Sequence, residues 1–432
     1  MAVDAARRLA FDVLRAVDVD DAYANLELAR LTRERRLSAR DAAFAVELTA
    51  GTLRMRRPYD VIVGRLAPRR PDPAVTDVLR LGCHQLLSMR VPAHAAVATS
   101  VSLTRAAIGH RPAGFVNAVL RRVAERTFEE WMDELGAGLA ERTSHPAWIT
   151  EALAEALDDD DELAALLHAD NVPPRVTLVA RPGLATVEEL PGEALPISPY
   201  AVASSGGDPG AIPAVREGRA GVQDAGSQVV ALAAAAADPD GNDAIWLDMC
   251  AGPGGKAALL QALGDQRGAT LLAAELAPHR AALVRAAGVR HVVCADGARP
   301  AWLMGRFDRV LLDAPCSGLG ALRRRPEARW RRSYDDLSAL TDLQARLIRT
   351  AADATRPGGV LAYATCSPVV SETVEIVRGL VAERPGVRLL DAPALLPWIE
   401  NARSAHLAEA LQLWPHRHGT DAMFLALLRV EG

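Results

Sequence analysis

The stretch from Trp246 to Lys256 constrains the fold more than any other part of the chain. An apolar run ends at Asp248, and three glycines and one proline follow within seven residues, before an alanine- and leucine-rich segment begins. This order predicts a strand, a tight glycine turn and a helix whose N-terminus offers free N–H groups to a ligand. Glu275 ends the next apolar run, 20 residues after Gly255, where a carboxylate is suited to accept hydrogen bonds from both hydroxyls of a ribose. The stretch therefore predicts a site for a nucleoside-containing cofactor, although a glycine turn that binds nothing has a similar local pattern.

From residue 244 onward, segments of strand composition alternate with segments of helical pattern. This alternation predicts a parallel, doubly wound sheet that binds its ligand at the carboxyl ends of the strands. The predicted strands are 244–248, 271–275, 291–294, 308–313, 359–364 and 422–430, and the predicted helices are 256–264, 278–287, 336–356 and 369–383.

The N-terminal part of the chain has helical periodicity instead. Apolar residues recur at spacings of three and four from Val3 to Val17, and Ser38 and Asp41 form a capping-box-like start to a further helix. Residues 145–240 mix helical pieces, a strand-like segment at 175–180, and an acidic stretch at 158–161 that we expect to be a solvated loop. We therefore expect three domains: an all-α domain at 1–130, a small α+β linker domain at 145–240 and an α/β Rossmann-like domain at 241–432.

Charge is distributed unevenly along the chain. The whole chain carries −5, whereas residues 1–130 carry 21 arginines against 15 acidic residues, a balance of +6. The basic N-terminal part suggests an anionic partner, although arginines that only solvate helices would give the same balance. Lys256 is the only lysine in the chain, which indicates a specific need for a compact, flexible ammonium group there.

Several classes of protein are disfavoured by simple counts. The longest apolar run has nine residues, too short to cross a bilayer, and the N-terminus lacks a signal-peptide pattern, so we expect a cytoplasmic protein without membrane association. Five cysteines without paired metal spacing argue against both a disulfide framework and a metal site. His416 and His418 have no third ligand nearby in the sequence, so we expect no metal there either.

Reactive side chains follow three further predicted strands. Asp296 follows the third strand, where its carboxylate could accept a hydrogen bond from an adenine amino group; Asp313 and Cys316 follow the fourth, and Cys366 follows the fifth. A single cysteine is most often a small buried apolar residue. Two cysteines in small-residue loops at one sheet edge favour catalysis instead.

Two cysteines and a carboxylate suit the methylation of a pyrimidine. Carbon 5 of cytosine becomes nucleophilic only after a thiolate has added to carbon 6, and a carboxylate such as Asp313 at the Watson–Crick edge would help the ring accept the charge. Loss of the carbon 5 proton and expulsion of the thiolate then benefit from a second group. The residues alone do not distinguish which cysteine attacks.

The segments Asp248–Lys256, Asp313–Gly318 and Thr365–Pro368 together resemble the Nop/Sun family of S-adenosylmethionine-dependent RNA cytosine-5 methyltransferases. Residues 114–122 and 222–228 resemble its bacterial RsmB (Sun/Fmu) branch, which has a NusB-like RNA-binding domain and acts on small-subunit ribosomal RNA. The resemblance spans essentially the whole chain. Two departures are Ala257, where the family usually has a hydroxyl residue, and 421–424, where it usually has Asp-Gly-Phe-Phe.

The resemblance implies methylation of carbon 5 of a cytosine in 16S ribosomal RNA through a covalent cysteine–cytosine intermediate. It implies that Cys366 is the nucleophile, that Cys316 assists product release and that Asp313 belongs to the catalytic set. It also implies that S-adenosylmethionine is surrounded by Cys250, Ala251, Gly252, Pro253, Gly254, Gly255, Lys256, Glu275, Asp296 and Asp313. We further expect an RNA partner, no metal and a monomer.

The sequence disfavours two other interpretations. A dehydrogenase that uses NAD is disfavoured because the loop is not a spaced G-x-G-x-x-G, and because the two cysteines would have no role. A NusB-like RNA-binding factor with an inactive C-terminal domain is disfavoured because the reactive residues are present together. The segment 323–332 holds six arginines around Trp330, which predicts a phosphate clamp with a stacking aromatic residue, although a solvated loop has the same composition.

Overall fold

The computed structural model describes residues 4–431. The chain divides into two compact units, of which unit 1 comprises residues 1–150 and 322–331, and unit 2 comprises residues 151–321 and 332–432. The predicted division into three domains stays a prediction, because neither unit reproduces its boundaries.

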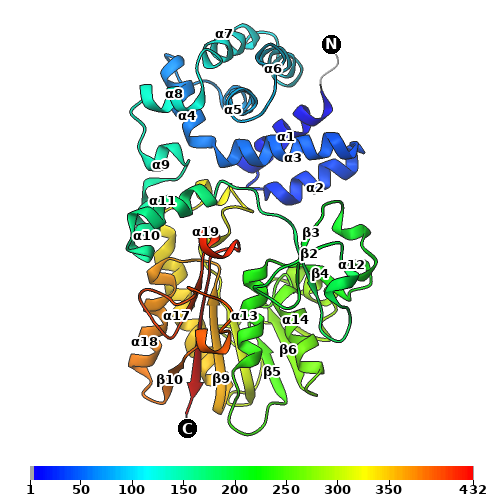
Figure 1. The fold of residues 1–432 in the computed structure, drawn as a ribbon, viewed down its shortest axis with the longest axis vertical. Helices are drawn as coiled ribbons and strands as arrows, with labels where there is room; N and C mark the ends of the chain where they lie inside the picture. Colours follow the sequence, from blue (N-terminus) through cyan, green and yellow to red (C-terminus); the bar gives the residue numbers. More distant parts are fainter. Residues whose placement is uncertain (1–3, 432) are drawn as a thin grey trace. The chain divides into compact units, whose positions relative to one another are not determined.

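The described residues of unit 1 form helices joined by turns and loops, with no strand among them (Figure 1). Its helices are α1 (Ala5–Val19), α2 (Ala24–Arg35), α3 (Ala39–Arg54), α4 (Arg56–Leu66), α5 (Pro73–Leu87), α6 (Ala93–Ala107), α7 (Ala113–Val123), α8 (Phe128–Glu134), α9 (Leu139–Arg142) and α16 (Ala328–Arg331). Helix α10 (Ala147–Leu157) continues into unit 2.

Local sequence signals explain why these helices begin and pack where they do. The side chain of Ser38 accepts a hydrogen bond from the backbone N–H of Asp41, which confirms the predicted start of α3. Leu9, Val13 and Val17 on α1 are buried in the core of unit 1, which confirms the predicted apolar face for these residues, whereas Val3 lies outside the described residues. Burying such side chains contributes about 1.5–3 kcal/mol each.

Unit 2 contains a small antiparallel sheet and a large mixed sheet. The small sheet has the order β2-β3-β1-β4, with β1 (Thr177–Ala180), β2 (Gly192–Ala194), β3 (Ala201–Ser204) and β4 (Ala220–Val222). The expectation for 158–161 is wrong in part: these residues are exposed, but Asp159 caps α11 (Asp160–Ala169), so the stretch starts a helix. The remaining short elements of this region are η1 (Val187–Glu189), η2 (Pro209–Ala211) and α12 (Pro213–Arg216).

The large sheet has the order β10-β12-β9-β8-β5-β6-β7, and β11 pairs with β12. Its strands are β5 (Ile245–Asp248), β6 (Thr270–Glu275), β7 (His291–Cys294), β8 (Phe307–Asp313), β9 (Thr355–Thr365), β10 (Val387–Leu390), β11 (Leu411–Leu413) and β12 (Met423–Val430). The five strands from β9 to β7 are parallel, as predicted, whereas β12 runs antiparallel to β9 and corrects the prediction of a wholly parallel sheet. The chain enters β12 from its antiparallel neighbour β11 rather than through a crossover helix, so β12, which lies between β10 and β9, runs in the opposite direction.

Helices cover both faces of the large sheet (Figure 1). Alternate residues of β9 explain this: Val360, Ala362 and Ala364 join the core that contains α13 and α14, while Leu361 and Tyr363 join the core that contains α17 and α18. The helices and short turns of this part are α13 (Ala225–Ala236), α14 (Gly255–Asp265), α15 (Pro278–Ala286), α17 (Asp335–Ala354), α18 (Val374–Glu383), α19 (Pro415–His418), η3 (Leu319–Ala321), η4 (Val370–Glu372) and η5 (Pro393–Leu395). Among the helices of residues 4–431, none has both the length and the apolar character that a bilayer crossing requires.

Candidate active site

The predicted reactive residues meet at one edge of the large sheet. Asp248 pairs in register with Leu311 of β8 and Ala273 of β6, and Asp313 pairs with Ala364 of β9. Because these strands are parallel, their carboxyl ends and the loops that follow them lie at the same edge. The sheet therefore brings together the glycine loop, the Asp313–Cys316 loop and the Cys366 loop.

Glu275 organises the glycine loop. Its side chain is almost fully buried, and its two carboxylate oxygens accept hydrogen bonds from the backbone N–H groups of Gly252 and Ala277, each at 3.0 Å. A Cβ at Gly252 would lie 2.2 Å from a Glu275 oxygen, so only glycine allows this approach. Arg280 donates to the Gly252 carbonyl at 2.6 Å and closes the turn.

This arrangement fits a nucleoside-containing cofactor. The loop is free of side-chain bulk at Gly252, α14 begins directly after it at Gly255, and a buried carboxylate with further acceptor capacity stands beside it. Asp296 lies just beyond β7, where its carboxylate accepts the backbone N–H of Ala298 at 2.9 Å. Its predicted contact with an adenine stays a prediction.

The single lysine forms an ion pair at the same edge. Lys256 Nζ lies 2.8 Å from Asp313 Oδ2, with 12% and 24% of the two side chains exposed. Burial lowers the pKa of Lys256, but the charge of Asp313 and the hydrogen bond to it outweigh this, so the net shift is upward. Burial, followed by the negative charge of Asp313, raises the pKa of Asp248 to about 8, and Lys256 opposes that rise. The positive charge of Lys256 therefore acts on two acidic side chains, Asp313 through an ion pair and Asp248 through its pKa.

The two predicted catalytic cysteines are in contact. The sulfur atoms of Cys316 and Cys366 are 3.5 Å apart. The hydrogen bond from the Cys316 thiol lowers the pKa of Cys366, and the charge of Lys256 acts in the same direction. The same hydrogen bond, together with burial and the negative charges of Glu372 and Asp313, raises the pKa of Cys316. Cys366 is therefore the sulfur that more readily becomes a thiolate.

The other cysteines lie outside this pair. Burial raises the pKa of Cys250, the first residue of the predicted cofactor loop, so it stays a thiol. Ala251 is buried and donates its backbone N–H to the Ala274 carbonyl, which fastens the loop to β6. Cys294 is exposed at the end of β7, and Cys83 is buried in unit 1.

Sequence reasoning missed Glu372. This glutamate ends η4, is fully buried and accepts hydrogen bonds from the residues next to the two predicted catalytic cysteines. Its position six residues after Cys366, in a polar stretch, gives no signal of burial. Gln344 is also buried and donates a hydrogen bond to Glu372, and it was missed because a single polar residue in a helical segment gives no signal of burial either.

The predicted phosphate clamp is wrong for the core of the arginine-rich segment. Arg329 is fully buried in unit 1 and donates to the backbone carbonyls of Arg54, at 3.1 Å, and Ser144, at 3.2 Å. The indole N–H of Trp330 donates to the carbonyl of Leu53 at 3.1 Å. These groups satisfy helix-end carbonyls instead of meeting a phosphate or a base.

The histidine segment at 416–418 pairs with a carboxylate of the same unit. His416 and Arg417 both contact the carboxylate of Glu162, and no group of residues suited to a metal ion occurs within residues 4–431.

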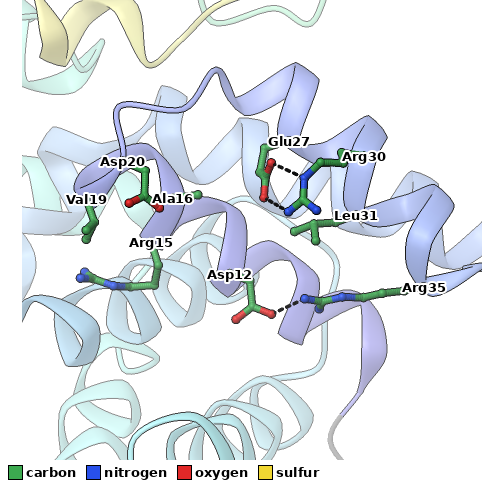
Figure 2. A pocket seen from close by; sticks show the side chains of 9 residues that line it. All are labelled: Asp12, Arg15, Ala16, Val19, Asp20, Glu27, Arg30, Leu31 and Arg35. Carbon is green, nitrogen blue, oxygen red and sulfur yellow. Dashed lines mark hydrogen bonds and ion pairs between the residues drawn. The ribbon is translucent and has the colours of Figure 1, made fainter.

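Figure 2 shows a surface pocket of unit 1, where Glu27 is paired with Arg30 and Asp12 with Arg35. None of the predicted site residues lines this pocket.

Comparisons with known proteins agree with this geometry. Residues 234–429 match the family model described as 16S rRNA methyltransferase RsmB/F, and residues 4–125 match the NusB family. A Mycobacterium tuberculosis protein named as a methyltransferase is 49% identical over 449 residues, covering 99% of this chain and 97% of the relative. The ribosomal RNA small subunit methyltransferase B of Vibrio vulnificus is 32% identical over 389 residues, covering 85% of this chain and 88% of the relative.

Two solved structures share the fold. The crystal structure of PH0851 has a TM-score of 0.80 at 20% identity and covers 99% of both chains. NSun6 from Pyrococcus horikoshii, solved with SFG, has a TM-score of 0.57 at 18% identity, covering 66% of this chain and 98% of that one. With its NusB-type helical part and its Rossmann-like C-terminal part, the chain belongs to the RsmB/F family of 16S ribosomal RNA methyltransferases.

Proposed function

We propose that this chain methylates carbon 5 of a cytosine in 16S ribosomal RNA, with Cys366 as the covalent nucleophile. Methylation of small-subunit ribosomal RNA with S-adenosylmethionine as the methyl donor is the activity of the family. The proposal adds the base, the position on the base and the covalent route. Its main support is the 3.5 Å contact between the sulfurs of Cys316 and Cys366, beside the Lys256–Asp313 pair.

The proposed chemistry begins with the Cys366 thiolate, which the Cys316 thiol and Lys256 stabilise. The thiolate adds to carbon 6 of the cytosine, and carbon 5 of the resulting enamine becomes nucleophilic. S-adenosylmethionine supplies the methyl group that carbon 5 accepts. A base then takes the proton from carbon 5, the electrons of that carbon–hydrogen bond re-form the double bond between carbons 5 and 6, and the sulfur–carbon 6 bond breaks, so that Cys366 returns as a thiolate.

The remaining site residues have supporting roles in this proposal. Asp313 faces the Watson–Crick edge of the base, and its pairing with Lys256 holds its carboxylate in place. Cys316 is a thiol while the charged Cys366 beside it raises its pKa; once Cys366 is bonded to carbon 6, that charge is gone, so Cys316 can lose its proton to water and act as the base that takes the carbon 5 proton. Glu275 and the loop from Cys250 to Lys256 hold the cofactor, with Glu275 accepting the ribose hydroxyls.

The experiment compares three alanine variants on unmodified 16S ribosomal RNA. We expect Cys366→Ala to lose methylation and to form no adduct. We expect Cys316→Ala to methylate and then stall as a protein–RNA crosslink that survives denaturing electrophoresis and requires S-adenosylmethionine. Cys294→Ala is the matched control, because Cys294 is an exposed cysteine of the same unit and should leave both readouts unchanged.

The outcomes separate the possible roles. A persistent crosslink in Cys366→Ala and none in Cys316→Ala would reverse the two assignments. Normal methylation in both variants would leave the covalent route without a nucleophile. Mapping the methylated position by bisulfite sequencing tests the choice of base, since methylation elsewhere than carbon 5 of cytosine contradicts the proposal.

A further inference from the structure

Glu372 is a buried carboxylate in a place where burial needs a reason. Its side chain is fully buried, and it ends the turn η4 between β9 and α18. An isolated carboxylate in a protein interior costs several kcal/mol unless hydrogen bonds compensate for the lost water. Its partners therefore indicate what it does.

Three of the four hydrogen bonds that the Glu372 carboxylate accepts come from the two cysteine loops, and the fourth comes from α17. Its Oε1 accepts the backbone N–H of Ser317 at 2.7 Å and the side-chain amide of Gln344 at 3.1 Å. Its Oε2 accepts the hydroxyl of Ser317 at 2.5 Å and the hydroxyl of Ser367 at 2.6 Å. Ser317 directly follows Cys316, and Ser367 directly follows Cys366. One carboxylate thus joins the residues adjacent to both sulfurs.

The same two loops are also joined through the backbone. Gly320 donates its N–H to the carbonyl of Cys366 at 2.9 Å, and a Cβ at Gly320 would lie 2.8 Å from that oxygen and 2.1 Å from the carbonyl oxygen of Ala422. The hydroxyl of Tyr363 donates to the backbone carbonyl of Glu372 at 2.7 Å and holds the turn itself. The backbone at Glu372 is therefore held in place by Tyr363, and its carboxylate bonds to two loops that are already joined by a backbone hydrogen bond.

We propose that Glu372 is a positioning residue that clamps the Cys316 and Cys366 loops together and holds the two sulfurs in contact. The inference rests on the proposed covalent function, which needs both sulfurs at one base. Small displacements of reacting groups are costly, because about 1 Å of misplacement lowers rates by about a hundredfold. The negative charge of Glu372 also raises the pKa of Cys316, which keeps that sulfur as the thiol that donates to Cys366.

Glu372→Gln tests the clamp with little change in shape. One amide oxygen still accepts from Ser317 or Gln344, but the hydroxyls of Ser317 and Ser367 lose their charged acceptor and can only turn to accept from the neutral amide nitrogen. The matched control is Glu375→Gln, an exposed glutamate three residues away. Each variant is examined as the full chain by circular dichroism, by methylation kinetics and by disulfide formation between Cys316 and Cys366 under the thiol oxidant diamide.

Disulfide formation reports sulfur contact without any need for activity. Diamide takes up two protons and two electrons from the two thiols and is reduced to its hydrazine, which leaves one sulfur–sulfur bond that mass spectrometry detects. We expect Glu372→Gln to slow this bond by about tenfold and to lower kcat by about tenfold or more, while KM for S-adenosylmethionine stays within about twofold. Glu375→Gln should match the wild type in all three readouts.

If Glu372→Gln forms the disulfide and methylates RNA at the wild-type rates, the proposed role of Glu372 as a clamp is refuted. If the wild type forms the disulfide but methylates no cytosine, the proposed function fails, and the disulfide rates still decide whether Glu372 holds the sulfurs. If Glu372→Gln does not fold, Ser367→Ala decides in its place, because it removes one of the four hydrogen bonds to the carboxylate, together with the two that Ser367 Oγ accepts from Ser317 and Val369. A wild-type disulfide rate and kcat in folded Ser367→Ala would then refute the inference.

Discussion

Asp248→Asn tests whether the Asp248 carboxyl, at the end of β5, keeps its proton in the folded protein. Asp248 is fully buried, and burial together with the charge of Asp313 raises its pKa to about 8. The folded protein therefore holds a proton on this carboxyl at a pH where the unfolded chain, with a pKa of about 4, has released it. Asparagine has the same shape and does not titrate.

The sign and size follow from proton linkage. A group whose pKa is higher in the folded state contributes stability that is complete below the unfolded pKa and is lost as pH rises through the folded pKa. Each tenfold preference for the proton corresponds to about 1.4 kcal/mol, so the interval from about pH 4 to about pH 8 corresponds to roughly 5 kcal/mol. Because the strand end can relax when the carboxyl ionises, we expect about half of this amount.

The assay is urea unfolding of the wild type and of Asp248→Asn at several pH values from about 5 to about 8. The wild type should lose stability relative to the variant by about 2–3 kcal/mol across this interval, so the two curves diverge as pH rises. Asp342→Asn, an exposed aspartate on α17, is the control and should follow the wild type. Parallel curves for Asp248→Asn and the wild type would show that this carboxyl holds no proton and would refute the reasoning.

Three further outcomes are expected. Glu275→Ala should weaken S-adenosylmethionine binding by about ten- to a hundredfold in calorimetry, because hydrogen bonds to a charged acceptor are worth roughly 1.5–3 kcal/mol; unchanged affinity would remove Glu275 from the cofactor site. Lys256→Met should move the alkylation of Cys366 by iodoacetamide to higher pH, since the lysine charge lowers the pKa of that thiol; an unmoved profile would show that the charge does not reach the sulfur. Arg329→Met should lower the stability of unit 1 by about 2–4 kcal/mol in thermal unfolding, because buried carbonyls lose a charged donor. The control Arg332→Met, at an exposed arginine, should have little effect. Equal stability of Arg329→Met and the wild type would mean that these hydrogen bonds make no net contribution to stability.

Much of the site is readable from the sequence because its signals are local. A strand, a glycine turn and a helix produce a fixed order of residue types, and the structure has β5, the loop and α14 where the pattern predicts them. The same holds for Ser38 at the start of α3, since a helix cap involves residues only three apart. The sequence also predicts that Cys316 and Cys366 lie at the same end of the strands, because parallel strands align their carboxyl ends, and their sulfurs are in contact.

The rest depended on which distant groups become neighbours. The arginine-rich segment had the composition of a phosphate clamp, but tertiary packing in unit 1 provides backbone carbonyls for Arg329 and Trp330, and hydrogen bonds to those carbonyls replace solvent. The direction of β12 likewise followed from the return path of the chain and not from its own apolar pattern, which is the same for a parallel or an antiparallel strand.

The amino-acid sequence by itself determined the order of strands and helices, the glycine loop, and which residues are chemically able to bind a nucleoside or attack a base. Only the tertiary structure decided which charges are buried and what they touch. Glu372, Asp248 and Arg329 are ordinary charged residues along the chain, and each acquires its role from burial among partners that are distant in sequence. The physical reason is that hydrogen-bond satisfaction and pKa depend on the groups within a few ångströms in space, and a local sequence pattern does not specify those groups.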